Sequence, residues 1–88
     1  GDKIGEEFDA GISGVADGGV DVVLKETRAE GMFRIRDVGD DFFVYDEKRY
    51  RIMGERTKKE YALGDPIKVK LVAARIPEKE LDFGLATS

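Results

Sequence analysis

The sequence has 88 residues and a formal net charge of −4, with no cysteine and no histidine. A chain of this length forms one domain with one modest core. Without cysteine it has neither a disulfide framework nor a thiolate metal site, which fits a reducing cytoplasm. The absence of histidine excludes three kinds of catalysis within this chain: by a serine–histidine pair, by a cysteine–histidine pair and by zinc. No apolar run approaches the roughly 20 residues that a membrane-spanning helix needs.

The first predicted strand covers residues 7–15, where apolar and polar side chains alternate. The side chains expected to face inward are Phe8, Ala10 and Ile12. Gly11 and Gly14 in the same run predict a bulged or coiled strand, as a small barrel needs where it turns a corner.

A hairpin is expected directly after this strand. The sequence ADGG at residues 16–19 is typical of such a turn, because glycine accepts a positive φ at little cost. The strand predicted over residues 19–24 turns its apolar positions inward, and these are Val20, Val22 and Leu24. The loop at residues 25–28 is short enough to make the next strand its antiparallel neighbour.

The strand predicted over residues 29–36, AEGMFRIR, has two faces with different properties. The face expected to be in the core carries Gly31, Phe33 and Ile35. The opposite face carries Met32, Arg34 and Arg36. The functional surface is therefore expected where the two guanidinium groups lie.

The pattern changes after Arg36. The sequence DVGDD at residues 37–41 predicts a turn or a single helical turn. Short strands are then expected at residues 42–45, 50–54 and 60–63, which together would form a small antiparallel meander. Across residues 46–50 a loop and a short helix remain as alternatives, because DEKRY has fair helix propensity.

The last part of the chain predicts two more strands. The sequence GDP at residues 64–66 indicates a turn, and residues 67–76 form a long strand with Lys68 and Lys70 facing outward. After a turn at residues 77–79, the final strand is expected to point three side chains toward the core: Leu81, Phe83 and Leu85. The fold class is therefore all-β. We expect a five-stranded barrel of the oligonucleotide/oligosaccharide-binding (OB) type, with a β-rich insertion between the third and fourth barrel strands.

Several sequence segments occur in a characteristic order: FDAGISGV, the glycine hairpin, EGMFRIRDV, LGDPIKVKLV and a closing LDFGL. This order resembles the S1 RNA-binding domain over essentially the whole chain. The insertion, GDDFFVYDEKRYRIMGERTKKEYALGD, is similar to the segment that the S1 domain of ribonuclease R carries at the same place. The most specific part is DEKRYRIMGERT, at residues 46–57.

The resemblance implies a module that holds single-stranded RNA for a hydrolytic 3′-to-5′ exoribonuclease of the ribonuclease II family. In that family a magnesium-binding carboxylate cluster in a separate domain forms the nuclease site, so neither catalytic residues nor a cofactor are expected in residues 1–88. A first residue of glycine and an ending in ATS favour a single domain excised from a longer protein. The expected partners are single-stranded RNA and the remainder of the parent exoribonuclease.

The chain departs from the S1 pattern where RNA usually binds. Two phenylalanines of the family's second strand are replaced by Gly18 and Asp21. The histidine common on the third strand is replaced by Arg34, and the aspartate often found near the end of the fourth strand falls at Arg75. Two stacking rings are absent, and with them roughly 1–3 kcal/mol of stacking per base.

Arginine can replace part of an aromatic platform, because its planar guanidinium stacks on bases and pairs with phosphate. We therefore place the centre of RNA binding at Arg34 and Arg36. An alternative is that Asp21 forms a cross-strand ion pair with Arg34, which RNA would have to displace. The candidate RNA-binding residues are Arg34, Arg36, Asp21, Phe43, Tyr45, Lys48, Arg49, Arg51, Lys58 and Lys59.

The richest aromatic cluster consists of Phe42, Phe43 and Tyr45. Not all three can face the core, and we expect Phe43 and Tyr45 on different faces of their strand, with Phe43 and Phe33 buried together. Tyr50 and Tyr61 are further candidates for stacking on bases.

A second interpretation is a protein-interaction or structural module that kept the barrel after losing its aromatic platform. The net charge of −4 favours it, since strong nucleic-acid binders are usually basic. The acidic pairs at residues 40–41 and 46–47 do not predict a metal site, because adjacent residues on a strand point to opposite faces.

Overall fold

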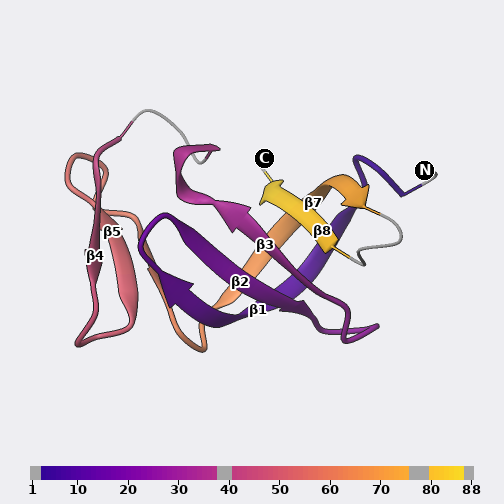
Figure 1. Ribbon diagram of the computed structural model, residues 1–88, viewed down its shortest axis with the longest axis horizontal. Coiled ribbons are helices and arrows are strands. Elements are labelled where there is room, and N and C mark those ends of the chain that lie inside the picture. Colours follow the sequence, from indigo (N-terminus) through magenta and orange to yellow (C-terminus); the bar gives the residue numbers. More distant parts are fainter. Residues whose placement is uncertain (1–2, 38–40, 76–79, 87–88) are drawn as a thin grey trace.

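A closed five-stranded barrel and a separate three-stranded sheet make up the structure, a computed structural model that describes residues 3–37, 41–75 and 80–86. The barrel strands are β1 (Glu7–Ala16), β2 (Gly19–Leu24), β3 (Glu30–Arg34), β7 (Pro66–Arg75) and β8 (Glu80–Leu85). Figure 1 shows the small sheet at one end of the barrel, next to the β1–β2 hairpin. The predicted fold class is confirmed.

The barrel is closed in the order β1-β2-β3-β8-β7. Its strands pair antiparallel except where β3 runs parallel to β8, with Met32 opposite Asp82. β1 pairs with both β2 and β7, and its register shifts between Ile12 and Gly14. This irregularity confirms the predicted bulge, which lets one long strand bend around the barrel.

The β1–β2 hairpin also forms as predicted. β1 ends at Ala16 and β2 begins at Gly19, so the turn is Asp17-Gly18. Gly18 has a φ of 96°, which explains why the turn needs a glycine. On β2, the predicted inward side chains are all buried: Val20, Val22 and Leu24.

One prediction about the third strand is wrong. β3 ends at Arg34, and residues Ile35–Asp37 form a short 3₁₀ helix, η1. The amide of Ile35 donates to the carbonyl oxygen of Gly18 at 3.0 Å, so the chain turns onto the β1–β2 hairpin instead of continuing along the ladder. Arg36 therefore does not share the strand face of Arg34.

The insertion is the predicted meander, with strands β4 (Phe43–Asp46), β5 (Arg51–Gly54) and β6 (Glu60–Ala62). Residues 47–50 form a turn and not the short helix that was the alternative. The predicted turn at residues 77–79 and the residues 38–40 lie outside the part of the chain that the structure describes.

A single core joins the small sheet to the barrel. The ring of Tyr61, on β6, packs edge-on against Phe33 of the barrel, with 5.9 Å between ring centroids. Its other neighbour is Phe43 of β4, at 6.3 Å. Tyr61 and Ile52 are buried in the same cluster as the barrel residues. The two sheets therefore bury one continuous apolar surface, which stabilises their relative placement.

The alternation on β4 corrects a second prediction. Phe43 and Tyr45 lie on the same face, because residues two apart on a strand point the same way, and both pack against the core. Phe42 and Val44 are exposed. Phe43 packs against the core that contains Phe33, as predicted, and both rings contact Tyr61.

Within the described residues, no helix has the length and apolar character needed to cross a membrane.

The approach of β8 to β3 predicts a specific sensitivity to substitution. A Cβ added at Gly31 would lie 2.7 Å from both the carbonyl oxygen of Leu81 and Cδ2 of Phe83. We expect Gly31→Ala to lower the free energy of unfolding by about 1–3 kcal/mol, as overpacking does. Urea denaturation followed by circular dichroism measures this change.

Gly11→Ala is the matched control, because a Cβ at Gly11 would have no neighbour within 4 Å. Its effect should stay within about 1 kcal/mol. Equal destabilisation by the two substitutions would show that the contact between β3 and β8 does not limit side-chain size at Gly31.

Candidate nucleic-acid interface

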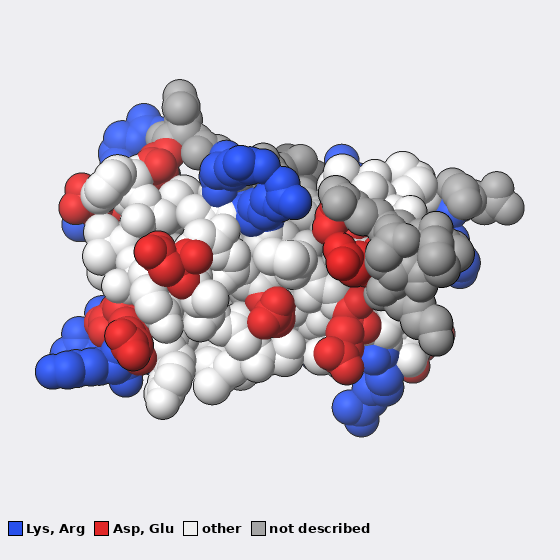
Figure 2. Space-filling view, viewed as in Figure 1, with Lys and Arg blue, Asp and Glu red and all other residues white. Residues whose placement is uncertain are grey.

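Two exposed arginines lie where β3 passes into η1. Arg34 is the last residue of β3 and stands opposite Gly19 on β2. Because Gly19 has no side chain, β2 does not cover this end of the face. Arg36 lies in η1 and is also exposed. Figure 2 shows Lys and Arg side chains gathered over the end of β3 and η1, and we call Arg34 and Arg36 the β3–η1 patch.

The ion pair between Asp21 and Arg34, which the sequence left as an alternative, is absent from the described residues. Asp21 stands opposite Met32, while Arg34 stands opposite Gly19, so the two charged residues are diagonal neighbours on the ladder. Side chains in that relation are roughly 7–8 Å apart at their bases. Asp21 lies instead over Gly14, where an added Cβ would be 2.9 Å from its Oδ2. The carboxylate therefore does not neutralise the guanidinium.

A shallow groove of about 730 Å³ runs along the outer face of β2, β3 and β8. Its apolar lining includes Val23, Met32 and Leu81. Its acidic lining consists of Asp21, Glu30, Glu80 and Asp82. Among the described residues no aromatic ring lines this groove, so it lacks the stacking platform expected of an RNA-binding barrel and carries a charge that repels phosphate.

The aromatic candidates are mostly used by the core. Phe43 and Tyr45 are half-buried against it, and Tyr61 is only 8% exposed. Burial raises the pKa of the Tyr61 hydroxyl. The accessible rings are instead Phe42, at 67% exposed, and Tyr50, at 57%. The period of two on β4 could have identified Phe42, once Phe43 was assigned to the core.

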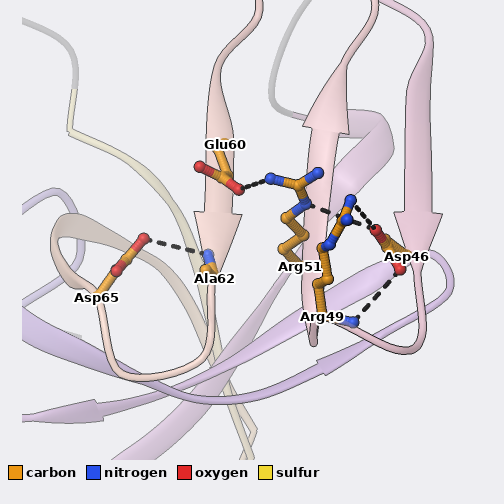
Figure 3. A network of polar contacts seen from close by, with 6 residues as sticks. All are labelled: Asp46, Arg49, Arg51, Glu60, Ala62 and Asp65. Atoms are coloured by element: carbon orange, nitrogen blue, oxygen red, sulfur yellow. Dashed lines mark hydrogen bonds and ion pairs between the residues drawn. The ribbon is translucent and has the colours of Figure 1, made fainter.

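Two of the basic candidates form ion pairs in the small sheet and its β4–β5 turn (Figure 3). Arg51 lies between Glu60, 2.5 Å from its Nη1, and Asp46, 3.6 Å from its Nε. The hydrogen bond from the Arg51 guanidinium to Glu60 raises the pKa of that guanidinium. Arg49 lies 3.6 Å from the same Asp46. The sequence alone did not reveal the pairing of Arg51 with Glu60, because it depends on the register of β5 and β6.

Three lysines remain as exposed cations. Lys48 is in the β4–β5 turn, and Lys58 and Lys59 are in the β5–β6 turn. None of them forms an ion pair within 4.0 Å in the described residues. Of the sequence candidates, five cations are therefore exposed and without an ion pair among the described residues: Arg34, Arg36, Lys48, Lys58 and Lys59.

Asp41 is a residue that the sequence analysis did not single out. Its carboxylate accepts hydrogen bonds from the Thr57 hydroxyl at 2.6 Å and from the Thr57 amide at 2.9 Å. The amides of Arg56, at 3.0 Å, and Phe42, at 2.7 Å, also donate to it. These bonds, that of the Thr57 hydroxyl first, hold the pKa of Asp41 well below its usual range. We call this set of hydrogen bonds the Asp41 clamp.

Gly54 makes room for the clamp. A Cβ at this position would collide with Oδ2 of Asp41 and would lie 2.9 Å from Oγ1 of Thr57.

The described residues contain no group of three or more acidic side chains that could hold a metal ion.

The closed five-stranded barrel, with the strand order β1-β2-β3-β8-β7, places the chain in the class of OB-like barrels. No family model matches the sequence. The chain is 40% identical to ribonuclease R of Aquifex aeolicus, over 94% of its own length and 12% of that protein. It is 31% identical to ribonuclease R of Escherichia coli, over 99% of its length and 11% of that protein.

A comparison with solved structures also finds ribonuclease R. The structure of Mycoplasma genitalium ribonuclease R in complex with ribose-methylated single-stranded RNA matches with a TM-score of 0.86 and 27% identity, over 97% of this chain and 13% of that one. The chain is homologous to a region of ribonuclease R, and its fold matches the S1-like region of that protein. It spans about a tenth of the length of the curated relatives that it matches.

The Asp41 clamp makes stability depend on pH in a defined range. The folded-state pKa lies below the ordinary value of 3.8, so the clamp stabilises fully above that value and is lost as the pH falls toward the folded-state pKa. We expect Asp41→Asn to flatten the decline of unfolding free energy between about pH 4 and pH 2. Urea denaturation at a series of pH values measures the unfolding free energy of both proteins.

Asp17→Asn is the matched control, because it also replaces an aspartate by asparagine, in the exposed β1–β2 turn. If Asp41→Asn and the wild type lost stability in parallel below pH 4, the hydrogen bonds to Asp41 would not hold in solution.

Proposed function

We propose that this chain binds single-stranded RNA through the β3–η1 patch, as the S1-type module of a ribonuclease R-like exoribonuclease. The observation that carries the proposal is that Arg34 and Arg36 are exposed and without an ion pair among the described residues, on a barrel homologous to a region of ribonuclease R. Their planar guanidinium groups can stack on bases and pair with phosphate oxygens.

Binding of this kind should be weak and nearly independent of sequence. The positions at which S1 domains carry stacking rings hold Gly18 and Asp21, so phosphate contacts supply most of the affinity. The acidic groove repels phosphate from the middle of the outer face. RNA is therefore directed to the edge of the barrel at which β3 ends.

The proposed role is to hold the RNA and guide it toward a nuclease site in another domain of the parent protein. That site would be the magnesium-binding carboxylate cluster of the family, and the parent would act in the cytoplasm. The hydrolysis of RNA from the 3′ end by the parent protein is also a proposal, because the chain spans only a small share of the length of its relatives.

A second candidate function is a protein-interaction module without RNA binding of its own. The acidic groove favours it, because apolar side chains and four carboxylates there suit a basic segment of a protein better than a nucleic acid. The two functions differ in their response to RNA, which the following experiment measures.

Charge reversal at the β3–η1 patch should weaken RNA binding severalfold. In Arg34→Glu/Arg36→Glu, two phosphate-binding cations become repulsive, and the slope of log affinity against log salt should fall by about 1 for each phosphate that is no longer bound. Fluorescence anisotropy with a labelled single-stranded oligoadenylate at two salt concentrations measures both quantities.

Lys3→Glu/Lys25→Glu is the matched control, since it changes the net charge equally on exposed residues that border a different pocket. A folded patch variant with wild-type affinity, or an equal loss of affinity in the control, would exclude the patch as the main contact. Absence of binding by the wild type at low salt would favour the interaction module.

A further inference from the structure

We infer that Asp41 positions the β5–β6 turn, residues 55–59, as a second phosphate-contacting element beside the β3–η1 patch. The inference rests on the proposed RNA binding and assigns a role to the insertion. In this view Asp41 does not touch RNA itself. It acts through the basic side chains of the turn, and so is a positioning residue.

The clamp fixes the backbone of the turn from outside. Two successive amides, those of Arg56 and Thr57, donate to the Asp41 carboxylate, and the Thr57 hydroxyl adds a third bond. The turn is closed by two backbone hydrogen bonds between its ends, from Lys58 to the Gly54 carbonyl at 3.0 Å and from Gly54 to the Lys59 carbonyl at 2.8 Å. The conformation of the turn therefore depends on Asp41, which precedes Arg56 by 15 positions and Thr57 by 16.

The same clamp keeps the turn near the β3–η1 patch. η1 ends at Asp37, and its start is anchored to the β1–β2 hairpin through the amide of Ile35. Asp41 follows four residues later, so the two Cα atoms lie at most about 14 Å apart. Since Asp41 is bonded directly to the turn, the turn and the patch are held within reach of one RNA strand. Figure 1 places η1 and the turn after β5 along the same edge of the molecule.

The turn presents cations to solvent. Lys58 and Lys59 are exposed and form no ion pair within 4.0 Å in the residues described. Lys58 adopts a φ of 63°, a left-handed conformation that a lysine rarely takes without support. The backbone bond from its amide to the Gly54 carbonyl supports this conformation and hence the direction in which the Lys58 Cβ leaves the backbone. A turn held in this way loses less entropy when phosphate binds.

Coulomb's law alone makes the opposite prediction for Asp41, which allows a decisive test. A carboxylate beside a phosphate-binding surface repels RNA, so its removal should tighten binding if it has no other effect. If Asp41 positions the turn, its removal should weaken binding even though the chain becomes less negative. The direction of the change therefore separates the two explanations.

The experiment measures binding of a labelled single-stranded oligoadenylate by anisotropy at two salt concentrations. We expect Asp41→Ala to bind severalfold more weakly than wild type, with a salt slope smaller by about 1–2, because one or both lysines no longer bind phosphate. Gly54→Ala should have the same effect with no change of charge, because its Cβ would displace Asp41. Glu26→Ala, in the β2–β3 turn, is the matched loss of an exposed carboxylate and should not weaken binding.

A double-mutant cycle shows whether Asp41 acts through the lysines. Lys58→Ala/Lys59→Ala should weaken binding severalfold in the wild type, and should have almost no further effect in Asp41→Ala. Backbone-amide NMR spectra check that each variant is folded. Thr57→Val, which removes only the hydroxyl bond, replaces Asp41→Ala if the latter does not fold, and should weaken binding in the same direction.

Equal or tighter binding by folded Asp41→Ala would overturn the inference, as would full additivity of the two sets of substitutions. If Arg34→Glu/Arg36→Glu weakens binding while Lys58→Ala/Lys59→Ala does not, the inference fails and the proposed function stands. If the wild type does not bind at low salt, both fail.

Discussion

The close approach of β8 to β3 is the contact on which the rest of the structure depends. Leu81 and Phe83 lie so near Gly31 that no side chain fits there, and Phe83 is thereby buried at the centre of the barrel. This parallel pairing joins strands distant in sequence, and it closes the sheet so that β3 has no free edge. Once β3 is fixed, the direction in which the chain leaves it at Arg34 is fixed as well.

The insertion is joined to this barrel by packing and not by strand pairing. Tyr61 contacts both Phe33 of β3 and Phe43 of β4, so a ring from the small sheet completes the core of the barrel. Because packed interiors tolerate little movement, this contact sets how the small sheet sits relative to β3. The Asp41 clamp adds a polar link between the chain leaving η1 and the β5–β6 turn.

The charges divide the surface into regions with different chemistry. Carboxylates line the groove over β2, β3 and β8, whereas the accessible cations lie at its edge and in the turns of the insertion (Figure 2). Arg49 and Arg51 are paired with carboxylates of the small sheet and contribute little free charge. A chain of net charge −4 can thus offer phosphate a local basic surface, because screening limits each charge to roughly 10 Å at 0.1 M salt.

The sequence by itself determined the strands, the hairpin at Gly18 and the inward residues of β2, because alternation and turn preferences are local properties of the chain. Its likeness to the S1 domain of ribonuclease R indicated a five-stranded barrel and the place of the insertion. Only the tertiary structure decided the end of β3 at Arg34, the burial of Tyr61 and the pairing of Arg51. The first two depend on contacts between residues far apart in sequence, as does the Asp41 clamp, whose donors in the β5–β6 turn lie 15 and 16 residues away. The pairing of Arg51 depends on the strand register that brings it next to Glu60.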